Sequence, residues 1–114
     1  HSGNTRLIFS NQAHCFENRK GVEPEFFAGI QRHFFIDGNY YADEQSWYKA
    51  MVLFNDITEN VANSNGVPFV NQADYFTDKK EFFKDCVHMT IDGTHEKARL
   101  FFKKIVELGL LTRE

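Results

Sequence analysis

The fold is decided between residues 43 and 70, which read DEQSWYKAMVLFNDITENVANSNGVPFV. Apolar residues recur here at spacings of three and four, which predicts a helix over about 43–64 that Asp43 caps at its N-terminus. Its apolar positions are Trp47, Ala50, Met51, Phe54, Ile57 and Val61. The run 67–70 that follows is short and apolar, with Pro68 near its start, where a missing N–H is tolerated. This run predicts a buried strand.

An earlier apolar run, residues 6–10, is also short and ends in polar residues. It favours a buried parallel strand over an alternating antiparallel one. A strand, a helix and a strand in this order predict a parallel pair joined by a crossover helix. The polar residues 11–22 then form a surface loop at the C-terminal end of the first strand, where functional loops commonly lie.

Three further helical segments are predicted. Pro24 suits the first turn of a short helix that continues to Phe34. Asp78 and Glu81 resemble a capping box that opens a short helical turn through residues 82–83. The last helix extends over about 94–108, with Gly109 in the C-cap position. Its apolar face consists of Ala98, Phe101, Ile105 and Leu108.

The composition is that of one folded domain, residues 1–114. Hydrophobic residues make up 42% and charged residues 25%, which is too apolar for intrinsic disorder. Phe contributes 13 residues to an aromatic content of 16%, so the core or an interface must be rich in rings. The net charge of −3 leaves no basic excess for nucleic acid, and no apolar run approaches the roughly 20 residues of a membrane span. The first residues do not resemble a signal peptide, and the sequence does not indicate the cellular compartment of the protein.

Chemistry is expected in the segment Asp85-Cys86-Val87-His88, which precedes the last helix. A carboxylate held against one imidazole nitrogen fixes the tautomer, and it stabilises the cation that forms when the other nitrogen takes a proton. An irregular turn can fold Asp85 back on His88, with Gly93 allowing the chain to reverse into the helix. On spacing alone, an Asp-x-x-His pair is more often a capping aspartate near a surface histidine than a catalytic pair.

In context, this segment resembles the closing block of the SGNH hydrolases, also called the GDSL esterase and lipase family. That block is typically Asp-x-x-His-x-x-x-x-Gly ahead of the last helix, and Asp85, His88 and Gly93 occupy those places in order. The two predicted strands would be the family's fourth and fifth, and the helix between them its crossover. The resemblance covers nearly the whole chain and corresponds to the C-terminal half of the family's domain.

The resemblance implies an α/β fold of three layers, helix–sheet–helix, of the flavodoxin-like SGNH type. Here it would be present in part, as two parallel strands flanked by helices. It also implies ester hydrolysis by a Ser-His-Asp mechanism, with His88 as the general base and Asp85 as its orienting acid. The substrate would be a small-molecule or carbohydrate-linked acyl ester, and no cofactor or metal is expected.

The family's other blocks are absent from this sequence, namely the Gly-Asp-Ser nucleophile block and the Gly and Asn blocks that complete the oxyanion hole. An Asp–His pair without them positions a proton acceptor but does not carry out acyl transfer, so the chain alone is expected to be inactive on esters. The competing hypothesis is a non-catalytic half-domain that binds a partner or itself. Uncovered sheet edges and apolar helix faces would favour a homo-oligomer, or pairing with the missing half.

A metal site is an alternative for the same region, because imidazole and carboxylate suit zinc or manganese. A helix starting near residue 94 would carry its later members away from the loop, which weakens this interpretation. The candidate ligands are His88, Asp92 and His95, with Asp85 and Glu96 nearby.

The two cysteines allow one disulfide, yet free thiols are the expected state of Cys15 and Cys86. Cys86 is expected to be a small buried thiol rather than a nucleophile. His14 and Cys15 lie in the loop after the first strand, where a substrate could pass, although a solvated loop is the default interpretation.

Overall fold

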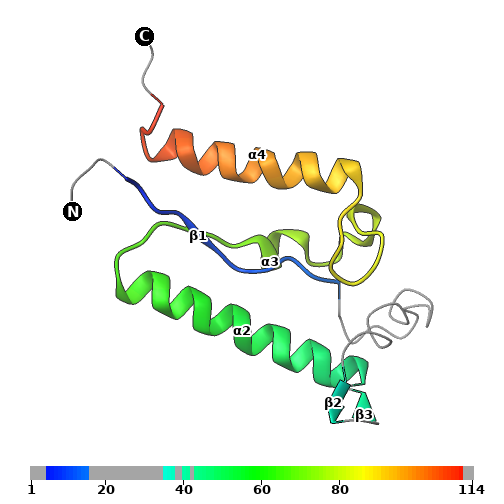
Figure 1. Cartoon of the computed structure of the whole chain (residues 1–114). Helices are drawn as coiled ribbons and strands as arrows, with labels where there is room; N and C mark the ends of the chain where they lie inside the picture. Colours follow the sequence, from blue (N-terminus) through cyan, green and yellow to red (C-terminus); the bar gives the residue numbers. More distant parts are fainter. Residues whose placement is uncertain (1–4, 16–34, 38–39, 42, 112–114) are drawn as a thin grey trace.

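The chain has a mixed α/β architecture in a computed structural model that describes residues 5–15, 35–37, 40–41 and 43–111. Strand β1 (Phe9–Ser10) pairs in parallel with β4 (Phe69–Val70), and helix α2 (Glu44–Ser64) connects the two along the chain. Helix α4 (Ile91–Glu107) lies on the opposite side of the strand pair from α2 (Figure 1). The predicted parallel pair with a helical crossover is confirmed, although both strands are shorter than the predicted 6–10 and 67–70.

Smaller elements complete the described chain. Strands β2 (Phe35–Asp37) and β3 (Tyr40–Tyr41) form an antiparallel pair, which was not predicted. Helix α3 (Gln72–Phe76) follows β4 directly and was also missed. A 3-10 turn, η1 (Lys80–Phe82), leads towards α4. The helix predicted from Pro24 to Phe34 lies outside the described residues.

The long helices begin and end where local chemistry directs them. Asp43 caps α2 as predicted, because its carboxylate accepts the Ser46 N–H at 2.7 Å. Helix α4 begins three residues before the predicted position, since the Thr90 hydroxyl accepts the Gly93 N–H at 3.1 Å. Gly109 follows α4 with φ of 62°, the left-handed conformation expected of a C-terminal glycine.

Two predictions about the approach to α4 are wrong. Gly93 lies in the first turn of the helix and does not reverse the chain ahead of it. It is required by packing, because a Cβ at this position would lie 2.3 Å from the backbone oxygen of Phe82. The N-cap of η1 is also not Asp78 as predicted but Lys79, which carries no side-chain capping bond. Asp78 instead adopts a left-handed conformation with φ of 63°.

The best-buried cluster is built around Phe76, beyond the C-terminal ends of the strands. Its ring meets those of Phe82 and Phe83 edge-to-face, with centroids 5.8 and 6.0 Å apart. Ala13 and Phe83 are buried with it, and Leu100 of α4 packs against the same cluster. Phenylalanine thus supplies the core that holds α3, η1 and α4 together, as the composition suggested.

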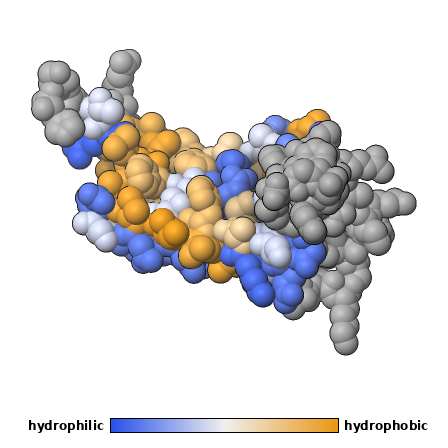
Figure 2. All heavy atoms as spheres, turned by 60° about the horizontal axis from the view of Figure 1, so that its bottom comes forward, coloured by the Kyte–Doolittle hydropathy of each residue, from blue (hydrophilic) through white to orange (hydrophobic). Residues whose placement is uncertain are grey.

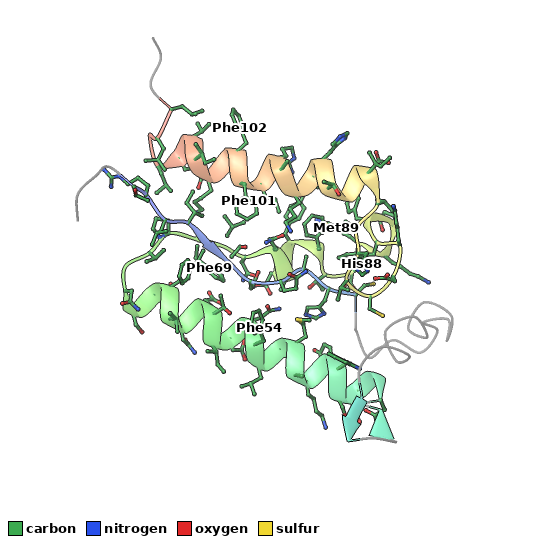
Figure 3. The ribbon with its side chains drawn as sticks, in the orientation of Figure 1. Phe54, Phe69, His88, Met89, Phe101 and Phe102 are labelled. Atoms are coloured by element: carbon green, nitrogen blue, oxygen red, sulfur yellow. The ribbon has the colours of Figure 1, made fainter. Side chains whose placement is uncertain are left out.

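The apolar stripe of α2 is only partly covered. The buried residues of the helix are Asn55 and Ala62, while Phe54, Ile57 and Val61 remain about half exposed. Two strands present too narrow a surface for the whole apolar sector of a helix with this pattern. Figure 2 shows the exposed apolar side chains gathered along one side of the molecule. Helix α4 is similar, since Phe101 faces the strands while Phe102 points outwards (Figure 3).

Helices α3 and α4 are tied by a surface network of polar groups. The Tyr75 hydroxyl donates to Glu96, and the Arg99 guanidinium donates to both Glu96 and Tyr75. These bonds, from Arg99 first and Tyr75 second, lower the pKa of Glu96 to about 2. Because the folded-state pKa lies below the unfolded value, the stabilisation is present above the ordinary carboxyl range and is lost as pH falls towards 2.

We therefore expect Glu96→Gln to flatten the acid branch of the stability curve. The melting temperature of the parent chain should fall more steeply between about pH 4.5 and pH 2 than that of the variant, because only the parent must protonate this carboxylate. Thermal unfolding followed by circular dichroism measures both slopes. Glu107→Gln is the matched control, since the ion pairs of Glu107 stay within α4. If the melting temperatures of the two variants fell equally steeply with pH, protonation of Glu96 would not be coupled to folding through this network.

Candidate functional site

A tight loop, residues 84–88, carries the predicted Asp–His pair. The Lys84 N–H donates to the His88 carbonyl at 2.7 Å and closes the loop at its base. Phe83 and Met89 face each other as an antiparallel bridge just outside it. This closure folds the 84–88 loop back on itself, as the irregular-turn interpretation required.

Asp85 organises the interior of the loop. One carboxylate oxygen, Oδ1, accepts the backbone N–H groups of Val87 and His88 at 2.9 and 2.8 Å. The other, Oδ2, lies 2.7 Å from His88 Nδ1. Burial by itself would raise the pKa of Asp85, but the two backbone donors and the imidazole outweigh it and lower the pKa. The carboxylate is therefore held in its charged form, and it is both a cap of the loop and a partner of the ring.

His88 is placed to accept a proton at its other ring nitrogen. Its side chain is 74% exposed, whereas that of Asp85 is 32% exposed. A carboxylate acceptor at Nδ1 favours the tautomer with the proton on Nδ1, which leaves the Nε2 lone pair available. The pair can therefore remove a proton from an approaching hydroxyl and stabilise the resulting imidazolium.

The segment after β1 is hydrogen-bonded to the 84–88 loop. The Cys15 N–H donates to the Cys86 carbonyl at 2.7 Å, a backbone link between segments about seventy residues apart. Cys86 is 1% exposed and packs against Trp47, Tyr48 and Met51 of α2. Neither Cys15 nor Cys86 forms a disulfide. Cys86 is thus the buried packing thiol that was expected, and it has no access to a substrate.

A network of side-chain amides, which sequence reasoning missed, fixes the segments that follow the strands. Asn55 of α2 exchanges two hydrogen bonds with the backbone of Gln12, at 2.8 and 3.0 Å. Asn11 donates to Asn71 at 2.6 Å, and Gln72 donates to the Asn11 carbonyl at 2.9 Å. Polar residues directly after both strands were the available signal, but spacing did not show that they would meet.

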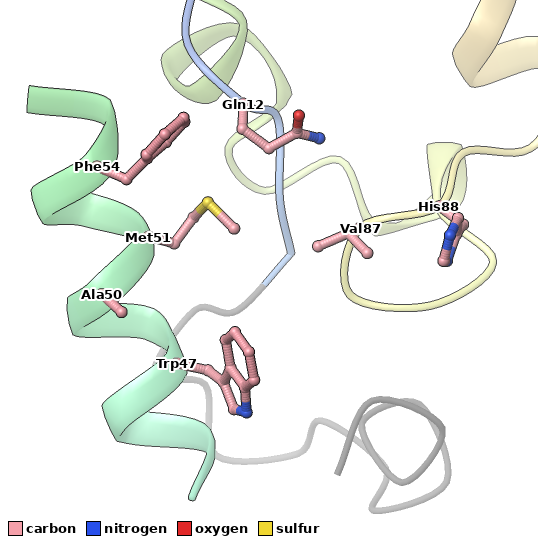
Figure 4. Close-up of a pocket in the computed structure, with 7 residues that line it drawn as sticks. All are labelled: Gln12, Trp47, Ala50, Met51, Phe54, Val87 and His88. Carbon is pink, nitrogen blue, oxygen red and sulfur yellow. The ribbon is translucent and has the colours of Figure 1, made fainter. Parts of the chain in front are cut away.

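An open pocket of about 590 Å³ lies next to the loop, between it and α2. Figure 4 shows the residues that line it, with the α2 side chains on one side and the 84–88 loop on the other. They are Gln12, Trp47, Ala50, Met51, Phe54, Val87 and His88. Most of the lining is apolar, and the imidazole and the Gln12 carboxamide are its polar groups.

The other flank of α2 borders a polar pocket of about 380 Å³ against α3. Asp56 and Glu59 line it from α2, Asn71 and Asp74 line it from the α3 side, and His14 is a further lining residue. Burial lowers the pKa of His14, whose ring meets that of Tyr48 edge-to-face. His14 therefore lies on the flank of α2 opposite to the Asp85–His88 pair.

The alternative metal cluster does not assemble in the described part of the chain. Asp92 and His95 are exposed on α4, and Glu96 is engaged by Arg99 and Tyr75. No three histidine, cysteine, aspartate or glutamate side chains converge there at metal-binding distance.

The described part of the structure contains no helix that is long and apolar enough to cross a membrane.

Comparison of the chain with protein-family models, with curated proteins and with solved structures found no match. The geometry of residues 84–88 and their surroundings is therefore the basis on which a function is assigned.

Proposed function

We propose that this chain supplies the Asp–His half of an ester hydrolase of the SGNH type, with Asp85 orienting His88 as the general base. The hydrogen bond of 2.7 Å between Asp85 Oδ2 and His88 Nδ1 carries the proposal. A solvated capping aspartate would not need its second oxygen on the imidazole. The position of the pair beyond the ends of parallel strands, where α/β proteins place their sites, supports the same assignment.

In the proposed reaction, Nε2 of His88 takes the proton from a serine hydroxyl as the oxygen attacks the ester carbonyl. Asp85 stabilises the imidazolium, which then returns the proton to the departing alcohol oxygen. A water molecule repeats the cycle on the acyl-enzyme and releases the acid. The serine and the oxyanion donors come from a segment outside this sequence, since neither block is present in it.

The asymmetry of α2 supports a place for that segment. Within the described residues β1 pairs with β4 alone, and parallel sheets are normally wider and covered on both faces. The apolar flank of α2 lies on the side of Gln12, which continues β1, and the polar flank lies against α3, which continues β4. A further strand beside β1, with a helix on the exposed stripe, would bury that stripe. The polar flank would stay in water at the end of the sheet.

We expect the isolated chain to show no hydrolysis of a short-chain aryl ester above the buffer rate, because it lacks a nucleophile and an oxyanion hole. In a longer protein that contains both, His88→Ala should lower kcat/KM by about 10²–10⁴-fold. His95→Ala, an exposed histidine of α4, is the matched control and should have no effect. If the isolated chain hydrolysed the ester and His88→Ala abolished this activity, the proposal that the nucleophile lies in another segment would be wrong. If the longer protein stayed active with His88→Ala, His88 would not be the general base.

The second candidate function is self-association, and the exposed apolar stripe favours it. Leu53, Phe54, Ile57 and Val61 are 46–60% exposed and lie along α2. A contiguous apolar surface of this kind typically marks an interface. Pairing of two copies through the stripe would cover it without any catalytic role for the 84–88 loop.

Self-association through the stripe predicts that Ile57→Glu weakens it by more than about tenfold, because a charge would be buried at the interface. Ile91→Glu is the matched control, since Ile91 is an exposed isoleucine of the other long helix. Sedimentation equilibrium of the three proteins measures the change. A chain that stays monomeric at high concentration, or equal effects of the two substitutions, would refute association through α2.

A further inference from the structure

The face of α4 that points away from the strands carries a row of mostly apolar side chains. Its members recur at helical spacings and therefore lie along one side of the helix. We call them the outer row, which consists of Ile91, His95, Ala98, Phe102 and Val106. The exposed fraction is 72% for Ile91, 58% for Phe102 and 51% for Val106. Figure 3 shows Phe102 directed outwards on the far side of α4 from the strands.

The hydrolase proposal leaves the outer row uncovered. A strand added beside β1 would widen the sheet in its own plane. A helix on the exposed stripe of α2 would lie on the opposite side of the strands from α4 (Figure 1). Contiguous apolar side chains on a surface mark an interaction site. The outer row therefore needs a partner of its own.

The outer row is self-complementary when two copies of α4 run antiparallel. Ala98 lies near its middle, with Ile91 seven residues before it and Val106 eight residues after it. A twofold axis beside Ala98 brings Ile91 of one copy opposite Val106 of the second copy, and it brings His95 opposite Phe102. The small side chain of Ala98 lets the two helices approach closely where they cross.

The N-terminal half of the outer row provides a hole for Phe102. A hollow of about 190 Å³ is lined in part by Ile91, Thr94 and His95. Together with Ala98, these residues occupy the four positions that surround one inserted side chain of a facing helix. In the antiparallel arrangement, Phe102 of the second copy lies over this hole. Each copy then supplies one knob and one hole to the same interface.

The charges beside the outer row also match in the antiparallel arrangement. Asp92 and Lys103 lie on the same flank of the row, the acid near its N-terminal end and the base near its C-terminal end. Reversing one helix places Asp92 of one copy near Lys103 of the second copy, and the twofold axis repeats the pair. Arg99 lies on this flank near the axis, but Glu96 already neutralises it at 2.6 Å.

We propose that the outer row of α4 is the interface for a second copy of this chain, packed antiparallel about a twofold axis at Ala98. An anionic lipid surface would favour basic residues along the whole row, whereas Asp92 lies beside one end of it. The interface is separate from the 84–88 loop and from the exposed stripe of α2. The proposal therefore goes beyond the hydrolase function and does not depend on it.

Sedimentation equilibrium of the full chain tests the interface. The parent chain should dimerise, and Phe102→Glu should weaken the dimer at least about tenfold, because it buries a charge against the second copy. Phe102 is exposed, so that the substitution does not disturb the core. Ile57→Glu, on the stripe of α2, is the matched control and should dimerise like the parent. Ile91→Glu should resemble Phe102→Glu, since Ile91 belongs to the outer row.

Disulfide cross-linking tests the antiparallel arrangement. Under mild oxidation, Ala98→Cys should form a covalent dimer across the twofold axis. Val106→Cys should not, because antiparallel helices that cross at Ala98 hold its two copies roughly 20 Å apart. The parent chain, with Cys15 and Cys86, gives the background of cross-linking under the same conditions.

Every other outcome overturns the proposal. A parent chain that stays monomeric would do so, including the case in which a lipid surface or another protein covers the outer row. A loss of association in Ile57→Glu alone would assign the contact to α2. Equal cross-linking of Ala98→Cys and Val106→Cys, or none above the background, would exclude antiparallel packing at Ala98. None of these results involves ester hydrolysis, so that the interface and the hydrolase proposal stand or fall separately.

Discussion

The hydrogen bond between Asp85 and His88 is the interaction on which the functional meaning of this structure depends. A surface histidine on a loop would normally sample many rotamers and both tautomers, and it would have no defined chemistry. Here three bonds to one carboxylate fix the loop and the ring together. The link from Cys15 to Cys86 and the aromatic cluster around Phe76 then fix the loop relative to the strands.

The rest of the molecule is organised by the difference between the two flanks of α2. One flank is apolar, borders the 84–88 loop and continues into the exposed stripe, whereas the other is polar and meets α3. The same flank thus combines the proton acceptor, the apolar pocket and the surface that needs covering. A hydrolase half-domain uses all three features at once, because the segment that covers the stripe would bring the nucleophile to the ring. A self-association module uses only the third.

The sequence predicted those features that depend on neighbouring residues. The period of α2, its Asp43 cap and the apolar runs on either side were sufficient for the parallel pair and its crossover. The Asp85–His88 contact was also within reach, because three residues separate the partners. Features that depend on distant segments were missed or misassigned. Helix α3 has only five residues, Gly93 is required by the backbone of Phe82, and the exposure of the α2 stripe follows from how few strands lie beneath it.

The tautomer of the neutral His88 ring tests the central claim most directly. It is determined by ¹⁵N nuclear magnetic resonance of the imidazole. The account predicts that Nδ1 carries the proton in the parent chain, and that this preference is lost in Asp85→Ala. The exposed His95 on α4 should show the same tautomer ratio in both proteins and serves as the internal reference. A proton on Nε2 of His88 in the parent chain, or a ratio that Asp85→Ala leaves unchanged, would contradict the account.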